Sequence, residues 1–73
     1  MTLTDLSPGE TGIILNIEAD TTLSNRLREL GLLDGIAVRM VKMAPLKGPV
    51  EIKVHHSYLS IRWADAQTIR LQS

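Results

Sequence analysis

The sequence contains no cysteine and no phenylalanine, and its aromatic side chains are one tyrosine and one tryptophan. Without thiols the chain has no disulfide framework, no thiolate metal site and no thiol nucleophile, which fits a reducing compartment. A groove that binds proline-rich peptides is lined by several aromatic side chains. The scarcity of aromatic residues therefore argues against a polyproline-binding function.

The sequence also lacks a long apolar run and an excess of charge of either sign. No stretch approaches the roughly 20 apolar residues of a transmembrane helix, and Met1–Ser7 has neither the basic start nor the apolar run of a secretory signal. Eight basic and eight acidic side chains give a formal net charge of zero, whereas nucleic-acid-binding proteins present a basic face. We therefore expect a cytoplasmic protein that does not span a membrane and does not bind nucleic acid.

The 73 residues allow a single domain over positions 1–73. A chain this short buries only about 60% of the surface that its unfolded form exposes, so little stability is available for a deep catalytic cleft. Its serines lie in no nucleophile motif, and no glycine-rich phosphate loop is present. We expect neither an enzyme nor a bound cofactor.

One segment shows the spacing of a short helix and a clear stop signal. Leu23, Leu27 and Leu30 recur at helical spacing, which places them on one apolar stripe. Gly31 follows directly, and a glycine there can take the left-handed conformation that ends a helix while Leu32 folds back onto the last turn. The pattern predicts a helix that starts after a capping residue among positions 20–22 and ends near Leu30.

The rest of the chain reads as short strands joined by proline and glycine turns. Strands are predicted at 12–18, 36–44, 50–55, 58–62 and 68–71, with a short edge element at 2–6, a loop at 45–49 and a single helical turn at 63–67. This pattern is typical of a small half-open β-barrel. The predicted core comprises Leu15, Ile17, Leu27, Leu30, Val38, Met40, Ile52, Val54, Leu59, Ile61 and Ile69.

Four stretches of the chain, in order, resemble one protein family. Leu23–Gly35, which reads L-S-N-R-L-R-E-L-G-L-L-D-G, resembles the central motif of the ferrous iron transport protein A family, the FeoA-like domains. Leu6–Gly12 resembles the opening L-x-P-G-E turn of that family, Ala44–Ile52 its A-P-L-x-x-P segment, and Leu59–Ile69 its closing strands and acidic-Ala turn.

Two places depart from the family pattern. His55-His56 stands where the family usually turns through a glycine, and Trp63 is an unusual aromatic residue before the closing turn. Both departures bear on functions tied to that edge rather than on the fold.

The resemblance implies both a fold and a function. It implies a mainly β, SH3-like half-open barrel of about five strands, with one short α-helix inserted after the first long strand. It also implies a small cytoplasmic accessory or regulatory protein of bacterial ferrous iron uptake, which binds the cytoplasmic GTPase domain of a membrane ferrous iron permease. Two alternatives stay open: a metal-responsive regulatory domain, because similar barrels occur in metal-dependent transcriptional repressors, and a weakly metal-binding iron chaperone.

Two surfaces are candidates for docking a partner protein. In the 45–49 loop, the apolar Leu46 either folds back over the end of the barrel or serves as an anchor for a partner. On the predicted helix, Arg26 and Arg28 form a solvated face, a phosphate clamp or a docking face, since arginine is enriched at interface hot spots. The candidate partner-binding residues are Arg26, Arg28, Pro45, Leu46, Lys47 and Pro49.

His55-His56 is the one cluster of a residue type that commonly binds metals. Adjacent residues on a strand point to opposite faces, so regular β geometry does not let both imidazoles bind one ion. Glu51 is the nearest carboxylate in sequence, and three or four ligands are normal for zinc or iron sites. We expect solvated turn residues and no firm metal site, with His55, His56 and Glu51 as weak candidates.

Overall fold

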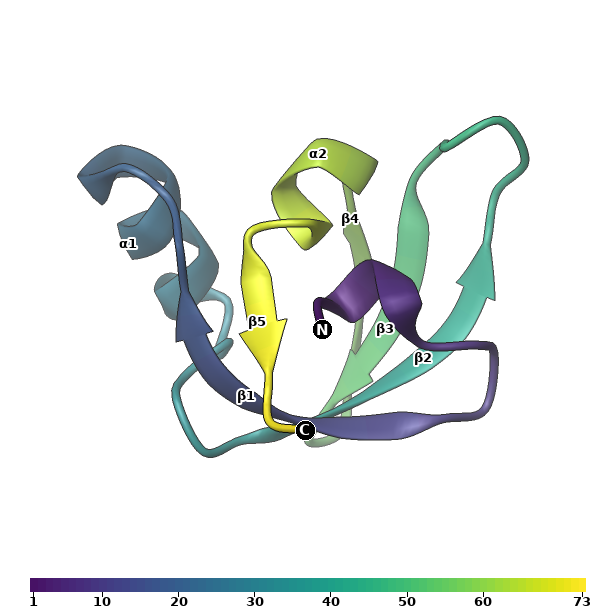
Figure 1. The fold of residues 1–73 in the computed structure, drawn as a ribbon, viewed down its shortest axis with the longest axis horizontal. Coiled ribbons are helices and arrows are strands. Elements are labelled where there is room, and N and C mark those ends of the chain that lie inside the picture. Colours follow the sequence, from purple (N-terminus) through teal and green to yellow (C-terminus); the bar gives the residue numbers. More distant parts are fainter.

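The computed structural model describes residues 1–73, and its five strands form one antiparallel sheet in the order β4-β3-β2-β1-β5 (Figure 1). In chain order the elements are the 3-10 helix η1 (Leu3–Asp5), β1 (Thr11–Ile17), α1 (Thr21–Glu29), β2 (Ala37–Met43), β3 (Val50–Val54), β4 (Ser57–Ile61), α2 (Trp63–Ala66) and β5 (Ile69–Leu71). The fold is mainly β with α1 inserted after β1, as predicted. None of the helices is long and apolar enough to cross a bilayer.

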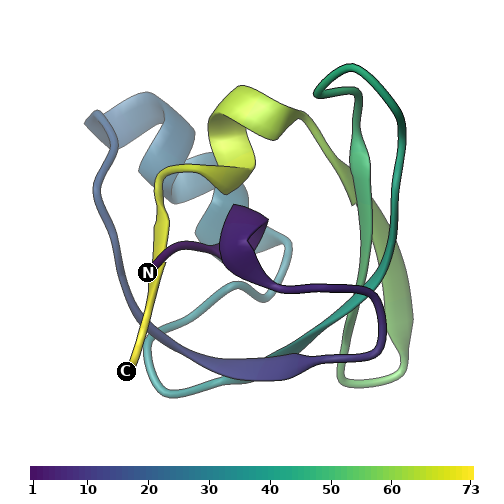
Figure 2. The same ribbon diagram turned by 45° about the vertical axis from the view of Figure 1, so that its right-hand side comes forward.

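Strand β1 bends so that its two halves pair with different neighbours. Positions 11–13 pair with β2, and positions 14–17 pair with β5. The N-terminal segment lies along the other side of β5, where Thr2 bridges Arg70 and the amide of Leu71 donates to the carbonyl of Met1 at 2.9 Å (Figure 2). Both long edges of β5 are therefore occupied.

At the centre of β1, the prediction of which side chains face the core is wrong. Leu15, expected in the core, is 48% exposed, whereas Ile14 is fully buried. The register with β5 shifts between Ile14 and Asn16, so Leu15 is the additional residue of a β-bulge. The bulge breaks the alternation and directs Ile14 and Ile17, three positions apart, to the same side.

Helix α1 has both of its predicted end signals. The side chain of Asp20 accepts a hydrogen bond from the amide of Leu23 at 2.8 Å, which caps the first turn. At the other end Gly31 has φ +97°, and the amide of Leu32 donates to the carbonyl of Leu27 at 3.2 Å. Together with the bond from the Gly31 amide to the Arg28 carbonyl at 2.9 Å, these contacts form a Schellman motif.

Leu30 is a second wrong core assignment, and the helix end explains it. Leu30 is the C-cap residue and is 45% exposed, while Leu32 is fully buried. The chain reverses at Gly31, so Leu32 packs inward with Leu27 and takes the place that helical spacing assigned to Leu30.

The core is one cluster without any buried polar or charged residue. Of the predicted core residues besides Leu15 and Leu30, Leu59 is half-buried against the cluster and the others are buried. Trp63, the unusual aromatic, begins α2 and also packs against the cluster. The prediction missed several buried residues, namely Leu3, Leu6, Ile14, Leu32, Val50, Ala66 and Leu71.

Candidate docking surface

The loop between β2 and β3 projects from one end of the sheet (Figure 1). The Ala44 amide donates to the Pro49 carbonyl and the Gly48 amide to the Pro45 carbonyl, both at 3.1 Å, so the loop is closed at its base. Leu46 at its tip is 99% exposed. Of the two sequence-based alternatives for Leu46, folding back over the barrel end is therefore wrong.

The tip of this loop holds two non-glycine residues in the left-handed region. Leu46 has φ +59° and Lys47 has φ +57°. Such residues cost of order 1–3 kcal/mol each and cluster at binding and switch sites. The backbone thus holds an apolar side chain out in solvent at an energetic cost.

A groove of about 580 Å³ lies at the foot of the loop. One part of its wall comes from the end of β2 and the loop, with Met43, Ala44, Pro45 and Pro49. The rest comes from β3 and β4: Glu51, Tyr58, Leu59 and Ser60, with Lys42 across from Glu51. An open groove with apolar walls and one charge of each sign suits an apolar side chain of a partner.

Tyr58 stands at the rim of this groove and is 61% exposed. The ammonium group of Lys53, the cross-strand neighbour of Tyr58, lies 5.6 Å from the centre of its ring. This cation–π contact holds a positive charge over β4 rather than over β3. Lys53 has no salt-bridge partner.

The two candidate arginines do not belong to this surface. Helix α1 lies at the end of the molecule away from the β2–β3 loop (Figure 1). Arg28 is engaged within the chain, since its Nε donates to Ser24 Oγ at 3.3 Å and its Nη1 lies 3.6 Å from Asp34 Oδ1. Arg26 is exposed and forms no salt bridge. Of the pair, Arg26 is free to contact a partner.

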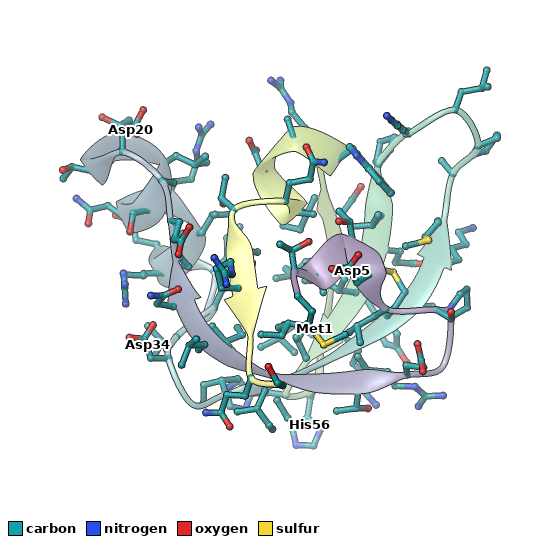
Figure 3. The ribbon with its side chains drawn as sticks, in the orientation of Figure 1. Met1, Asp5, Asp20, Asp34 and His56 are labelled. Atoms are coloured by element: carbon teal, nitrogen blue, oxygen red, sulfur yellow. The ribbon has the colours of Figure 1, made fainter.

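The two histidines form the two-residue loop of the β3–β4 hairpin, and both are exposed. His56 lies at the end of the molecule opposite the β2–β3 loop (Figure 3). Glu51 lies instead in the wall of the groove. No group of three or more His, Cys, Asp or Glu residues is placed to hold a metal ion. The structure thus does not join His55, His56 and Glu51 into one ligand set.

Sequence reasoning missed the part of the groove that β4 supplies. Tyr58 and Ser60 occupy alternate positions of that strand, and the register sets them opposite Lys53 and Glu51. The alternating pattern of β4 is visible in the sequence. The strand pairing that brings Tyr58 and Ser60 beside Pro45 and Pro49 is a tertiary feature.

The sequence matches the family model of the FeoA domain over residues 1–73. The chain belongs to the FeoA family. It is 29% identical over 72 residues to a Porphyromonas gingivalis protein named Fe(2+) transport protein A/Fe(2+) transporter FeoB fusion protein. That match covers 99% of this FeoA chain but spans only 8% of the fusion protein's length.

Solved FeoA structures share the fold. A crystal structure named iron uptake regulatory protein (FeoA) superposes with a TM-score of 0.90 at 25% identity, covering 99% of this chain and 95% of that one. A Stenotrophomonas maltophilia FeoA complexed with zinc, named an SH3 domain protein, superposes with a TM-score of 0.86 at 28% identity, covering 99% and 89%. The predicted SH3-like fold is confirmed, and the family supports a role in ferrous iron transport.

Proposed function

We propose that this FeoA chain is a cytoplasmic, non-catalytic accessory protein of bacterial ferrous iron uptake that docks on the cytoplasmic GTPase domain of a membrane ferrous iron permease. The relative in which a transport protein A and a FeoB transporter form one polypeptide supports this partner, because a fusion keeps two domains at high effective concentration. The docking surface is inferred from one observation: the apolar side chain of Leu46 is 99% exposed beside the groove.

The energetics of the loop favour an interface over a solvent-exposed role. An apolar side chain gains about 1.5–3 kcal/mol when it is transferred from water into a partner's pocket. The proline-flanked loop, closed by two backbone hydrogen bonds, already holds Leu46 outward, which limits the conformational entropy lost on binding. A chain of this size offers a modest interface, which fits a transient complex.

The docking surface is tested by Leu46→Asp in a binding assay with the soluble GTPase domain of the permease, together with an iron-uptake assay in cells. We expect Leu46→Asp to abolish binding and uptake while the circular dichroism spectrum stays unchanged and the melting temperature does not fall, because Leu46 makes no core contact and aspartate tolerates positive φ. The matched control is Leu33→Asp, which places the same charge at another exposed leucine, outside the groove.

A second variant tests the helix face. If the charge of Arg26 steers the encounter, Arg26→Ala weakens association with a marked dependence on salt concentration. If Leu46→Asp and Arg26→Ala both stay folded and support wild-type uptake, neither surface docks the permease. The family membership would be unaffected by that result.

Metal binding is a second candidate function, as a weak iron chaperone or a metal-responsive domain. The zinc complex of the Stenotrophomonas maltophilia FeoA favours it. In this chain the exposed His55-His56 loop is the place where imidazoles could bind an ion, but only two histidines lie there.

A further inference from the structure

The sheet has one uncovered edge, at β4. Strand β5 at the other end is covered by the N-terminal segment, whereas no element pairs with the outer side of β4. Proteins normally protect such an edge with charged residues, proline or a β-bulge. Ser57–Ile61 contains no charge and no proline, and its register with β3 is unbroken.

The hairpin geometry shows which backbone groups face outward. A two-residue loop connects β3 and β4, so Val54 and Ser57 form a hydrogen-bonded pair. Alternation along the ladder then leaves Tyr58 and Ser60 in non-hydrogen-bonded pairs, with their N–H and C=O groups directed away from β3. None of the turn, loop, cap and side-chain hydrogen bonds of the protein involves these groups.

We propose that this edge binds an extended segment of the partner as an added antiparallel strand, with an acidic residue opposite Tyr58 and an apolar residue opposite Ser60. The inference rests on the proposed docking function and names the part of the partner that docks. In strand addition the backbone supplies the hydrogen bonds and alternate side chains supply specificity.

The acidic residue is inferred from the unpaired positive charge of Lys53 beside this edge. The Lys53 ammonium lies 5.6 Å from the centre of the Tyr58 ring and has no anionic partner, so a carboxylate opposite Tyr58 would neutralise it. The apolar residue is inferred from the groove, because Ser60 borders the cavity of about 580 Å³ between β4 and the prolines of the loop. Residues opposite Tyr58 and Ser60 are two positions apart and share one face.

A second copy of this chain fits the edge less well. An antiparallel β4 pair centred on Leu59 would set Tyr58 of one copy against Ser60 of the other, which brings a tyrosine ring to the groove but no carboxylate to Lys53. Charge complementarity therefore favours a different, acidic segment.

The probe is a capped peptide, Ser-Thr-Leu-Thr-Asp-Thr-Ser. When it pairs antiparallel to β4, its leucine lies opposite Ser60 and its aspartate lies opposite Tyr58. The test variant is Ser60→Pro, which removes one outward N–H without breaking the β3 ladder. The matched control is Ser60→Ala, which keeps the backbone donor. We expect Ser60→Pro to weaken peptide binding at least about tenfold and Ser60→Ala less than about twofold.

Two further readouts do not depend on Ser60→Pro folding correctly. On peptide binding to the wild-type chain, hydrogen exchange at the amides of Tyr58 and Ser60 should slow, because these donors are unbonded in the free protein. Lys53→Glu should weaken the aspartate peptide roughly two- to fivefold and strengthen a peptide with lysine in its place. Equal binding by Ser60→Pro and Ser60→Ala, or no added protection at either amide, overturns the proposal.

The remaining outcomes separate this inference from the proposed function. Self-association that Ser60→Pro removes, with no peptide binding, would assign the edge to a second copy and overturn the acidic segment. If the permease domain binds Ser60→Pro normally but not Leu46→Asp, docking stands and the edge proposal fails. If the peptide binds at the edge but the permease domain does not bind the chain, the edge site stands and the proposed partner fails.

Discussion

At the scale of single residues, a positive φ occurs at three glycines and also at three residues that have a Cβ. Gly9, Gly31 and Gly35 take positive φ, as turn and cap glycines do, but so do Leu46, Lys47 and His55. The glycines adopt this region without a Cβ penalty, whereas the other three carry strain. At Leu46 and Lys47 the strain accompanies the proposed docking loop, and at His55 it accompanies the departure from the family pattern.

Replacing Gly31 by valine should lower the free energy of unfolding by at least about 1 kcal/mol, because a β-branched residue resists the left-handed region. The residue has φ +97°, and an added Cβ would meet only Val54 Cγ1 at 4.0 Å, so the cost comes from the backbone rather than from a clash. Chemical denaturation measures it. Gly31→Asn serves as the control and should cost less, since asparagine tolerates positive φ. An unchanged melting temperature for Gly31→Val would count against this account of the helix end.

Replacing His55 by glycine should raise the free energy of unfolding by about 0.5–1 kcal/mol. His55 has φ +56° at the first position of the hairpin loop, and relief of that strain exceeds the entropy that a glycine adds to the unfolded chain. The control is His56→Gly, at a position without positive φ, which should give no gain. A larger gain at position 56 than at 55 would contradict the assignment.

At the scale of elements, each end of α1 is encoded locally, whereas β1 is not. The helix has its cap at Asp20 and its stop at Gly31, and both contacts join residues at most five positions apart. The side chains of β1 are sorted by a bulge that forms only when β5 pairs with it. Local contacts can be read from spacing, while a bulge depends on a strand that lies far along the chain.

The bulge makes a sharp prediction about two adjacent residues. Ile14→Ala should lower the free energy of unfolding by about 2–5 kcal/mol, as buried truncations do, because Ile14 is fully buried. Leu15→Ala should cost less than about 1 kcal/mol, because this side chain is half exposed. Urea denaturation of both variants measures the difference. A larger loss of stability in Leu15→Ala than in Ile14→Ala would show that Leu15 faces the core, and the bulge assignment would be wrong.

At the scale of the whole molecule, the ends of the barrel carry different features. The β2–β3 loop lies at one end and His56 of the histidine hairpin at the other (Figure 3). Glu51 lines the groove at the foot of the loop. A ligand set therefore cannot be assembled from the two histidines and this carboxylate. The separation assigns the candidate docking surface and the candidate metal ligands to different regions.

Anaerobic titration with Fe(II) should accordingly show no stoichiometric, submicromolar binding, because strong sites normally recruit three or four ligands. Isothermal titration calorimetry of the wild-type chain and of a His55→Ala/His56→Ala double variant gives the comparison, and the two should behave alike. Tight binding that is lost in the double variant would overturn this expectation and favour the chaperone function.

The sequence alone specifies the features that depend on neighbours within a turn or a strand. It predicts α1 with its cap and stop, the five strands, most of the core and the loop at 45–49, because spacing, proline and glycine act over a few residues. It also carries the motifs by which the FeoA family is identified.

Long-range pairing decides the rest. The bulge at Leu15, the groove between β4 and the loop, and the open edge at Tyr58 and Ser60 arise from contacts between segments distant in the chain. A strand's composition does not state which strand will pair with it or whether its edge will be covered. The candidate loop was therefore visible in the sequence, whereas the surface around it exists only in the folded sheet.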